Sequence, residues 1–192
     1  FENAFILLFD GKLSDVHGTL AALEVCAKSG KPLVLIAEDF DSEVLQFLIL
    51  NRIKNNIKVC AVKNPSFGDN RKALMQDIAI STKAHFISEE RGDSLKDVED
   101  FGTILGQAKK IIISKDNTTI MEGYGNKDLI KERIDNIRES IELTTSSYDK
   151  DKLKERLGKL TGGVAILKVG GASETEVNEL KDRIDDAICA TR

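Results

Sequence analysis

The sequence predicts a mixed α/β fold in which layers of mixed sheet are flanked by helices, and two observations support this class. Through the first half of the chain, short apolar runs of strand type alternate with amphipathic helical segments. In the second half, β-rich runs at 109–114 and 118–122 flank the polar turn Lys115-Asp116-Asn117, which is the pattern of a hairpin. Alternating strands and helices, followed by a hairpin, favour a sheet with helices packed against it.

The elements predicted for the first half follow the apolar runs and their boundaries. A helix that ends at Ser29, for example, has Gly30 where a C′ glycine belongs. In order, the elements are a strand at Phe5–Phe9, a helix at Asp15–Ser29, a strand at Leu33–Ala37, a helix from Asp41 or Ser42 to about Lys54, a strand at Ile57–Val62, a helix at about Asn70–Thr82 and a short strand at His85–Ile87.

The second half is predicted to begin with a loop and to end in charged helices. The acidic stretch Glu89–Gly106 is expected to be a loop with one weak helical turn. After the hairpin we expect helices at Asn126–Leu143 and Ser147–Leu160 and a strand at Val164–Val169. The capping-box sequence Ser173-Glu174-Thr175-Glu176 predicts the start of a last helix.

Two helices of the first half are apolar on two sides. In the stretch Lys31–Lys54, stepping by about 100° per residue separates two sets, namely Val44, Phe47, Leu48 and Asn51 on one side and Leu45, Ile49, Leu50 and Ile53 on the other. The helix before it places Val16, Leu20, Leu23 and Ala27 on one face and Ala22, Val25 and Cys26 on another. Either each helix is fully buried, or one side packs on the sheet while the other is free to bind a partner.

Composition argues against several classes of protein. The chain has 192 residues, of which 41% are hydrophobic and 31% charged, and this suits one soluble domain with room for an appendage. A net charge of only −4, with charges interspersed, indicates neither a nucleic-acid patch nor a polybasic membrane anchor. No apolar run approaches the roughly 20 residues of a membrane span. Because the chain begins without methionine inside a strand and stops within a helix, we expect an excised piece of a longer protein. The three cysteines are expected to be reduced core thiols: Cys26, Cys60 and Cys189.

Residues that could perform chemistry are few. The two histidines, His17 and His85, have no cysteine or carboxylate at metal-ligand spacing, so we expect no metal site. Glu38-Asp39 at a strand end could form an acid–base pair, although such residues are more often a solvated turn. The Gly170-Gly171 turn leads from a predicted strand into a helix, as phosphate-binding turns do, but it lacks the glycine and lysine pattern of known phosphate motifs. We therefore expect no catalytic residue.

A series of short motifs, in order along the chain, carries more information than any single residue. They are Lys31-Pro32-Leu33, Ile36-Ala37-Glu38-Asp39, Leu50-Asn51-Arg52, Ala61-Val62-Lys63, Phe67-Gly68-Asp69-Asn70-Arg71-Lys72, Gln76-Asp77-Ile78-Ala79, Gly106-Gln107-Ala108-Lys109, Lys115-Asp116, Tyr148-Asp149 and Gly162-Gly163-Val164-Ala165. Over essentially the whole chain, this series resembles the apical domain of the GroEL-type (group I) chaperonins.

The resemblance implies a fold of the chaperonin apical-domain (swivelling β/β/α) type. Residues 1–163 would be the apical domain, which binds polypeptide and co-chaperonin, and residues 164–192 would lead into the intermediate domain. The equatorial domain, which binds ATP and Mg in this family, would lie outside the chain. The piece itself would then be no enzyme, would hold no cofactor and would be mainly monomeric, whereas the parent chain would form homo-oligomeric, heptameric rings.

The resemblance also implies partners, a location and binding residues. The partners are non-native polypeptides and the mobile loop of the co-chaperonin, with no nucleic acid and no membrane. The location is cytoplasmic if the source is bacterial, and otherwise the mitochondrial matrix or plastid stroma. The binding groove would lie between the two doubly apolar helices, and its residues would be Leu20, Leu23, Glu24, Glu43, Leu45, Ile49, Leu50 and Asn51. The chain departs from the family's usual residues at Ser42, Gln46 and Phe47, which bears on client preference and not on the fold.

One alternative from another class stays open. An α/β enzyme domain could use the Gly170-Gly171 turn for a phosphate ligand and Glu38-Asp39 for acid–base work. Binding of a hydrophobic fluorophore or of an unfolded protein, without nucleotide affinity, would favour the binding module, and the most informative structural observation is the solvent exposure of Leu20, Leu23, Leu45 and Ile49.

Overall fold

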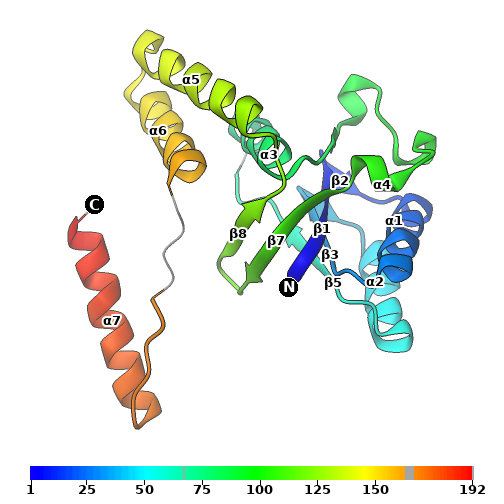
Figure 1. Ribbon diagram of the computed structural model, residues 1–192, viewed down its shortest axis with the longest axis horizontal. Helices are drawn as coiled ribbons and strands as arrows, with labels where there is room; N and C mark the ends of the chain where they lie inside the picture. The colour runs from blue at the N-terminus through cyan, green and yellow to red at the C-terminus, as the bar shows by residue number, and fades with distance from the viewer. Residues whose placement is uncertain (67, 163–166, 192) are drawn as a thin grey trace. The chain divides into compact units, whose positions relative to one another are not determined.

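The computed structural model describes residues 1–66, 68–162 and 167–191 (Figure 1). The chain divides into two units, Phe1–Gly162 and Gly163–Arg192. The larger unit is a mixed sheet with helices on both faces, so the predicted fold class is confirmed.

The main sheet has β1 (Glu2–Phe9) at its centre. On one side β1 pairs in parallel with β3 (Leu33–Ala37), which pairs in parallel with β5 (Val59–Lys63). On the other side β1 pairs antiparallel with β7 (Gly106–Ile113), which forms a hairpin with β8 (Thr118–Gly123). The short strand β6 (Phe86–Ile87) pairs with the end of β1.

The central strands are apolar throughout because both of their faces are covered. Alternate residues of β1 point to opposite sides, so Phe5, Leu7 and Phe9 enter one core while Ala4, Ile6 and Leu8 enter the other. Strands buried on both faces have continuous apolar sequences and not alternating ones. For this reason, the bounds predicted from the sequence for the strand Leu33–Ala37 are those that the structure shows.

Two helices cover the first face. The helix α1 (Val16–Ser29) is capped by Asp15, which accepts a hydrogen bond from the His17 amide, and ends at Gly30 in the left-handed conformation with φ 70°. The helix α2 (Ser42–Asn55) is capped by Asp41. Since α1 and α2 join parallel neighbouring strands, right-handed crossovers place them on the same face and running in the same direction.

A second, two-stranded sheet that was not predicted ties the starts of these helices together. The strands β2 (Lys12–Leu13) and β4 (Asp39–Phe40) pair in parallel just before α1 and α2. The Leu13 and Phe40 side chains are buried in the same core as the helices. This pairing therefore holds the N-termini of α1 and α2 side by side.

The stretch predicted as a loop at 89–106 contains more structure than expected. It holds the 3₁₀ helices η1 (Glu89–Arg91) and η2 (Leu95–Asp97) and the short helix α4 (Phe101–Ile104). Leu95 and Phe101 are buried in the α1 side of the core. Gly18 on α1 permits this packing, because a Cβ there would lie 2.6 Å from the Leu95 Cβ.

The second face is covered by α3 (Gly68–Thr82), and a helical hairpin, α5 (Lys127–Leu143) and α6 (Ser147–Thr161), packs against α3. A buried ionic clamp joins the three helices. The Asp77 carboxylate of α3 accepts hydrogen bonds from Arg133 Nε of α5 at 2.8 Å and from Arg156 Nε of α6 at 2.7 Å. Asp77 is almost fully buried, and both arginine side chains are mostly buried.

The smaller unit contains the helix α7 (Glu174–Thr191). The predicted helix start is confirmed, but only half of the capping box forms: the Glu176 amide donates to Ser173 Oγ at 3.3 Å, whereas the Glu176 carboxylate accepts from the Ala172 amide and not from the Ser173 amide. Residues 164–166 of the strand predicted at Val164–Val169 lie outside the described residues, and residues 167–169 are not in a strand.

Removal of the Asp77 carboxylate should destabilise the larger unit. We expect Asp77→Ala to lower the free energy of unfolding by about 3–5 kcal/mol, because two mostly buried arginines would keep their charges without a partner. Chemical denaturation measures this quantity. As a matched control, Asp135→Ala removes an exposed carboxylate that pairs with Arg138 at 3.1 Å and should cost less than about 1 kcal/mol. Equal losses in the two variants would show that the clamp contributes no more than a surface ion pair.

Candidate functional site

The outer surfaces of α1 and α2 expose large aliphatic side chains. Leu20 on α1 is 38% exposed, and on α2 Leu45, Ile49 and Leu50 are 36%, 56% and 51% exposed. Ile53, one turn beyond Ile49, is 75% exposed. Of the two readings left open by the sequence, the fully buried helix is therefore wrong for both α1 and α2.

The expected split of α2 into a core side and an outer side is confirmed. Val44 and Leu48 are buried in the core, and Phe47 and Asn51 are half-buried. The Asn51 side chain donates to the Phe47 carbonyl at 2.9 Å, which holds its amide against the helix. One side of α2 thus forms the core and the other carries the exposed residues.

On α1 the prediction for Leu23 is wrong. The sequence placed Leu23 and Leu20 on one face, and the resemblance implied that both are binding residues, but Leu23 is only 1% exposed and lies in the core with Ala22 and Cys26. The helical wheel of α1 agrees with this burial, because the polar residues His17, Glu24 and Lys28 lie within about 40° of one another on the side opposite Cys26. The sheet-facing arc runs through Thr19, Ala22, Leu23 and Cys26, and Leu20 lies at the edge of this arc.

The exposed apolar residues of α2 are spread over a wide arc around the helix axis. At about 100° per residue, Leu45 and Leu50 lie about 140° apart around the helix axis. Leu50 falls on the same side as Glu43, seven residues earlier, whereas Leu45 and Ile49 fall on the far side. The apolar surface therefore wraps over α2 and is not confined to the gap between the helices.

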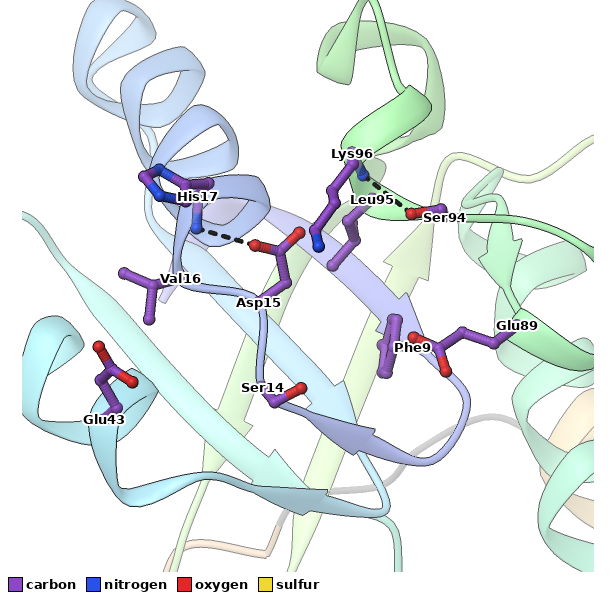
Figure 2. Close-up of a pocket in the computed structure, with 10 residues that line it drawn as sticks. All are labelled: Phe9, Ser14, Asp15, Val16, His17, Glu43, Glu89, Ser94, Leu95 and Lys96. Atoms are coloured by element: carbon purple, nitrogen blue, oxygen red, sulfur yellow. Dashed lines mark hydrogen bonds between the residues drawn. The ribbon is translucent and has the colours of Figure 1, made fainter.

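A pocket of about 350 Å³ shows which side of α2 faces α1 (Figure 2). It lies at the helix N-termini, where Val16 and His17 of α1 and Glu43 of α2 line one space together with Phe9, Leu95 and Lys96. Because Glu43 borders the same pocket as Val16, the side of α2 that carries Glu43 is turned toward α1.

The polar residues predicted at the groove edge are on the same surface. Glu24 and Glu43 are exposed, and Asn51 is half-buried. Within residues 1–66, 68–162 and 167–191, neither glutamate is in an ion pair. Both carboxylates are thus available to accept hydrogen bonds from a bound partner.

The alternative acid–base pair is occupied by ion pairs. Glu38 pairs with Arg71, and Asp39 pairs with Lys63. The hydrogen bond from Lys63, supported by one from the Phe40 amide, lowers the pKa of Asp39 below its ordinary value. A general base is most effective with a pKa near the working pH, so this shift is in the wrong direction for catalysis.

The Gly170-Gly171 turn is likewise taken by the chain itself. The Ala172 amide donates to Glu176 Oε2 at 2.9 Å, so a backbone donor that a phosphate would use already has a carboxylate partner. The negative charge of Glu176 also repels an anion at this place. Both observations disfavour the phosphate-binding alternative.

The cysteines differ from one another in burial. Cys26 is buried, and burial raises the pKa of its thiol to about 12, so it stays protonated at neutral pH. Cys60 is half-buried, whereas Cys189 on α7 is exposed, so the expectation of a core thiol is wrong for Cys189.

Two features are absent from the part of the chain that the structure describes. There, no three side chains of histidine, cysteine, aspartate or glutamate come together as a metal site would require. None of the described helices combines the length and the apolar character needed to cross a bilayer.

Comparisons with known proteins point in one direction. The model of the TCP-1/cpn60 chaperonin family matches residues 18–192. "Chaperonin CPN60-2, mitochondrial" of Zea mays is 51% identical to the chain over 191 residues, which cover 100% of this chain and 33% of the maize protein. The chain thus spans about a third of the length of the curated relative that it matches.

The stabilisation that the Asp39–Lys63 ion pair contributes should depend on pH. Because the pKa of Asp39 is depressed in the folded state, the stabilisation from this pair is present above the unfolded pKa of about 3.9 and is lost as the pH falls through the lower folded value. Carboxyl NMR titration should show this low pKa in the wild type and a higher one in Lys63→Met. Lys58→Met, a charge change elsewhere on the same segment, should leave the pKa of Asp39 unchanged. A near-neutral pKa for Asp39 would revive the acid–base alternative.

Proposed function

The chain belongs to the TCP-1/cpn60 chaperonin family, and on this premise we propose that its larger unit is the substrate-capturing apical domain of a group I chaperonin. It binds exposed apolar segments of non-native proteins on the outer surface of α1 and α2. One observation carries the proposal: Leu45, Ile49 and Leu50 are exposed on a helix whose opposite side is in the core.

The chemistry of the surface fits an unfolded chain as the ligand. Large aliphatic side chains gathered on one face of a soluble protein usually mark a binding surface. Covering them contributes roughly 25 cal/mol per Å² of apolar area removed from water, without demanding a particular sequence. The exposed carboxylates of Glu24 and Glu43 can accept hydrogen bonds from the backbone of an extended segment, and Asn51, whose amide bonds Phe47 and Asn55 within α2, contributes its remaining donor and acceptor capacity.

The contact residues in this proposal are those that the structure exposes at least in part. Leu23 supports the surface from beneath, since it is buried. The proposed contacts are Leu20, Glu24, Glu43, Leu45, Ile49, Leu50 and Asn51. The mobile loop of a co-chaperonin, itself an extended apolar segment, would compete for the same surface.

Other properties concern the longer protein and form part of the same proposal. Residues outside this chain would bind ATP and Mg and would assemble heptameric rings, while the isolated chain stays monomeric. The word "mitochondrial" in the name of the maize relative supports the mitochondrial matrix among the expected compartments.

Charge substitutions on the two sides of α2 test the proposal. In the double variant Leu45→Glu with Ile49→Glu, each exposed substitution should change the stability by no more than about 0.5 kcal/mol. Binding of an unfolded protein should be lost, because the apolar contact is replaced by carboxylates that must be desolvated. Thermal unfolding and a binding assay with a reduced, unfolded protein measure the two effects.

Val44→Glu is the matched control on the buried side of the same helix. It places a charge in the core and should cost about 3 kcal/mol or more, or prevent folding. If the double variant unfolds while Val44→Glu is tolerated, the site assignment is wrong. If the double variant folds and still binds, the proposed function fails.

A single copy of this surface should bind weakly. Rings that present several such surfaces to one client gain affinity from multivalency, so the isolated chain lacks this gain. We expect a Kd in the micromolar range or weaker for an extended apolar peptide, equivalent to about −8 kcal/mol or less favourable. Fluorescence anisotropy measures it, and nanomolar binding of generic unfolded chains would contradict the multivalent scheme.

A further inference from the structure

The helical period of α2 places one aromatic residue, Phe47, on the side that faces α1. Glu43 borders the pocket at the helix N-termini together with Val16 of α1 (Figure 2). Phe47, Leu50 and Asn51 follow Glu43 at intervals of four, seven and eight residues. These intervals return to the same side of a helix. Phe47 is therefore turned toward α1, one turn after the glutamate that the pocket shows to be there.

Apolar residues one turn apart also lie on the side of α1 that faces α2. Val16 borders the pocket, and Leu20 lies one turn further along on the same side. Val16 and Phe47 are both partly buried against the core cluster that contains Leu23. Because Leu20 and Leu50 are exposed whereas Phe47 is partly buried, Phe47 is the deeper residue and forms the floor of the gap between them.

We propose that Phe47 sets the size of the side chains that this gap accepts, an inference that rests on the proposed function. Its ring is the largest side chain on the floor, and only part of it is buried, so the rest limits the depth of the gap. Segments with small or β-branched residues then fit between Leu20 and Leu50, whereas large aromatic residues meet the ring. Phe47 is a specificity-determining residue and not the source of the apolar affinity.

The length of the two helices sets the length of peptide that fills the gap between them. A helix of 14 residues is about 21 Å long, and an extended chain advances about 3.3 Å per residue, so about six residues span the gap. Peptides of about ten residues therefore fill it completely. If every second residue carries the test side chain, each register places one at Phe47.

The experiment compares two such peptides with serine between the test residues, which are all valine in one peptide and all phenylalanine in the other. The 192-residue chain and its Phe47→Ala variant are titrated with each peptide. We expect the ratio of the phenylalanine-peptide Kd to the valine-peptide Kd to fall about tenfold in Phe47→Ala, because the floor deepens by most of an aromatic side chain. Phe47→Leu should give an intermediate ratio and carries the test if Phe47→Ala does not fold.

Ile53→Ala is the matched control, since Ile53 is an exposed aliphatic residue of the same helix that lies about 120° from Phe47 around the helix axis. Its ratio should stay within about twofold of the wild-type ratio. If the wild type binds the peptides but the ratio is unchanged in the Phe47 variants, the inference is overturned while the proposed function stands. If the wild type binds neither peptide, the proposed function itself is overturned, and the inference with it.

Discussion

The structure depends on the burial of both faces of β1 and β3. Strands that are apolar on both sides must be covered twice, and a crossover between parallel strands supplies a helix with each connection. On one face, α1 and α2 provide this cover with the arcs that contain Leu23 and Val44. Covering the sheet uses only about half of each helix, so what the other half carries is not fixed by the fold. Here it carries aliphatic residues.

The two faces of the sheet are covered by different numbers of helical layers. On the α3 side, a second layer made of α5 and α6 is attached through the buried Asp77 carboxylate. Gly123 and Gly125 bring the chain between β8 and α5 directly onto the end of α3, where a Cβ at either position would overlap a backbone carbonyl oxygen. On the other side, Leu45, Ile49, Leu50 and Ile53 are left exposed by the described part of the larger unit. The apolar surface is thus a property of the face with one helical layer.

How much of this could be predicted from the sequence depends on the kind of signal each element has. Buried strands such as Leu33–Ala37 and capped helices such as α1 have local signatures, and their positions were predicted to within about two residues. The strands β2 and β4 have only two residues each and no period, so they are visible only through their pairing. Leu95 and Phe101 lie in a stretch without periodicity, and their burial follows from contact with α1. The burial of Leu23 could have been predicted, because the polar residues His17, Glu24 and Lys28 mark the outer side of α1 opposite Cys26; Leu23 was instead named as a contact through the family resemblance.

The carboxylates near the proposed binding surface are partly used by the helices themselves. Asp15 and Asp41 cap their helices by accepting backbone amide hydrogen bonds, and Glu43 lies in the first turn of α2, where the helix dipole favours a negative charge. These carboxylates stabilise the helices themselves, so much of their negative charge is already balanced by the helix N-termini. In the proposed function, the free energy of binding would come mainly from the aliphatic surface, whose contribution is non-directional and discriminates little between sequences. Selectivity would then come from shape, which is the role that we propose for Phe47 in the gap between α1 and α2.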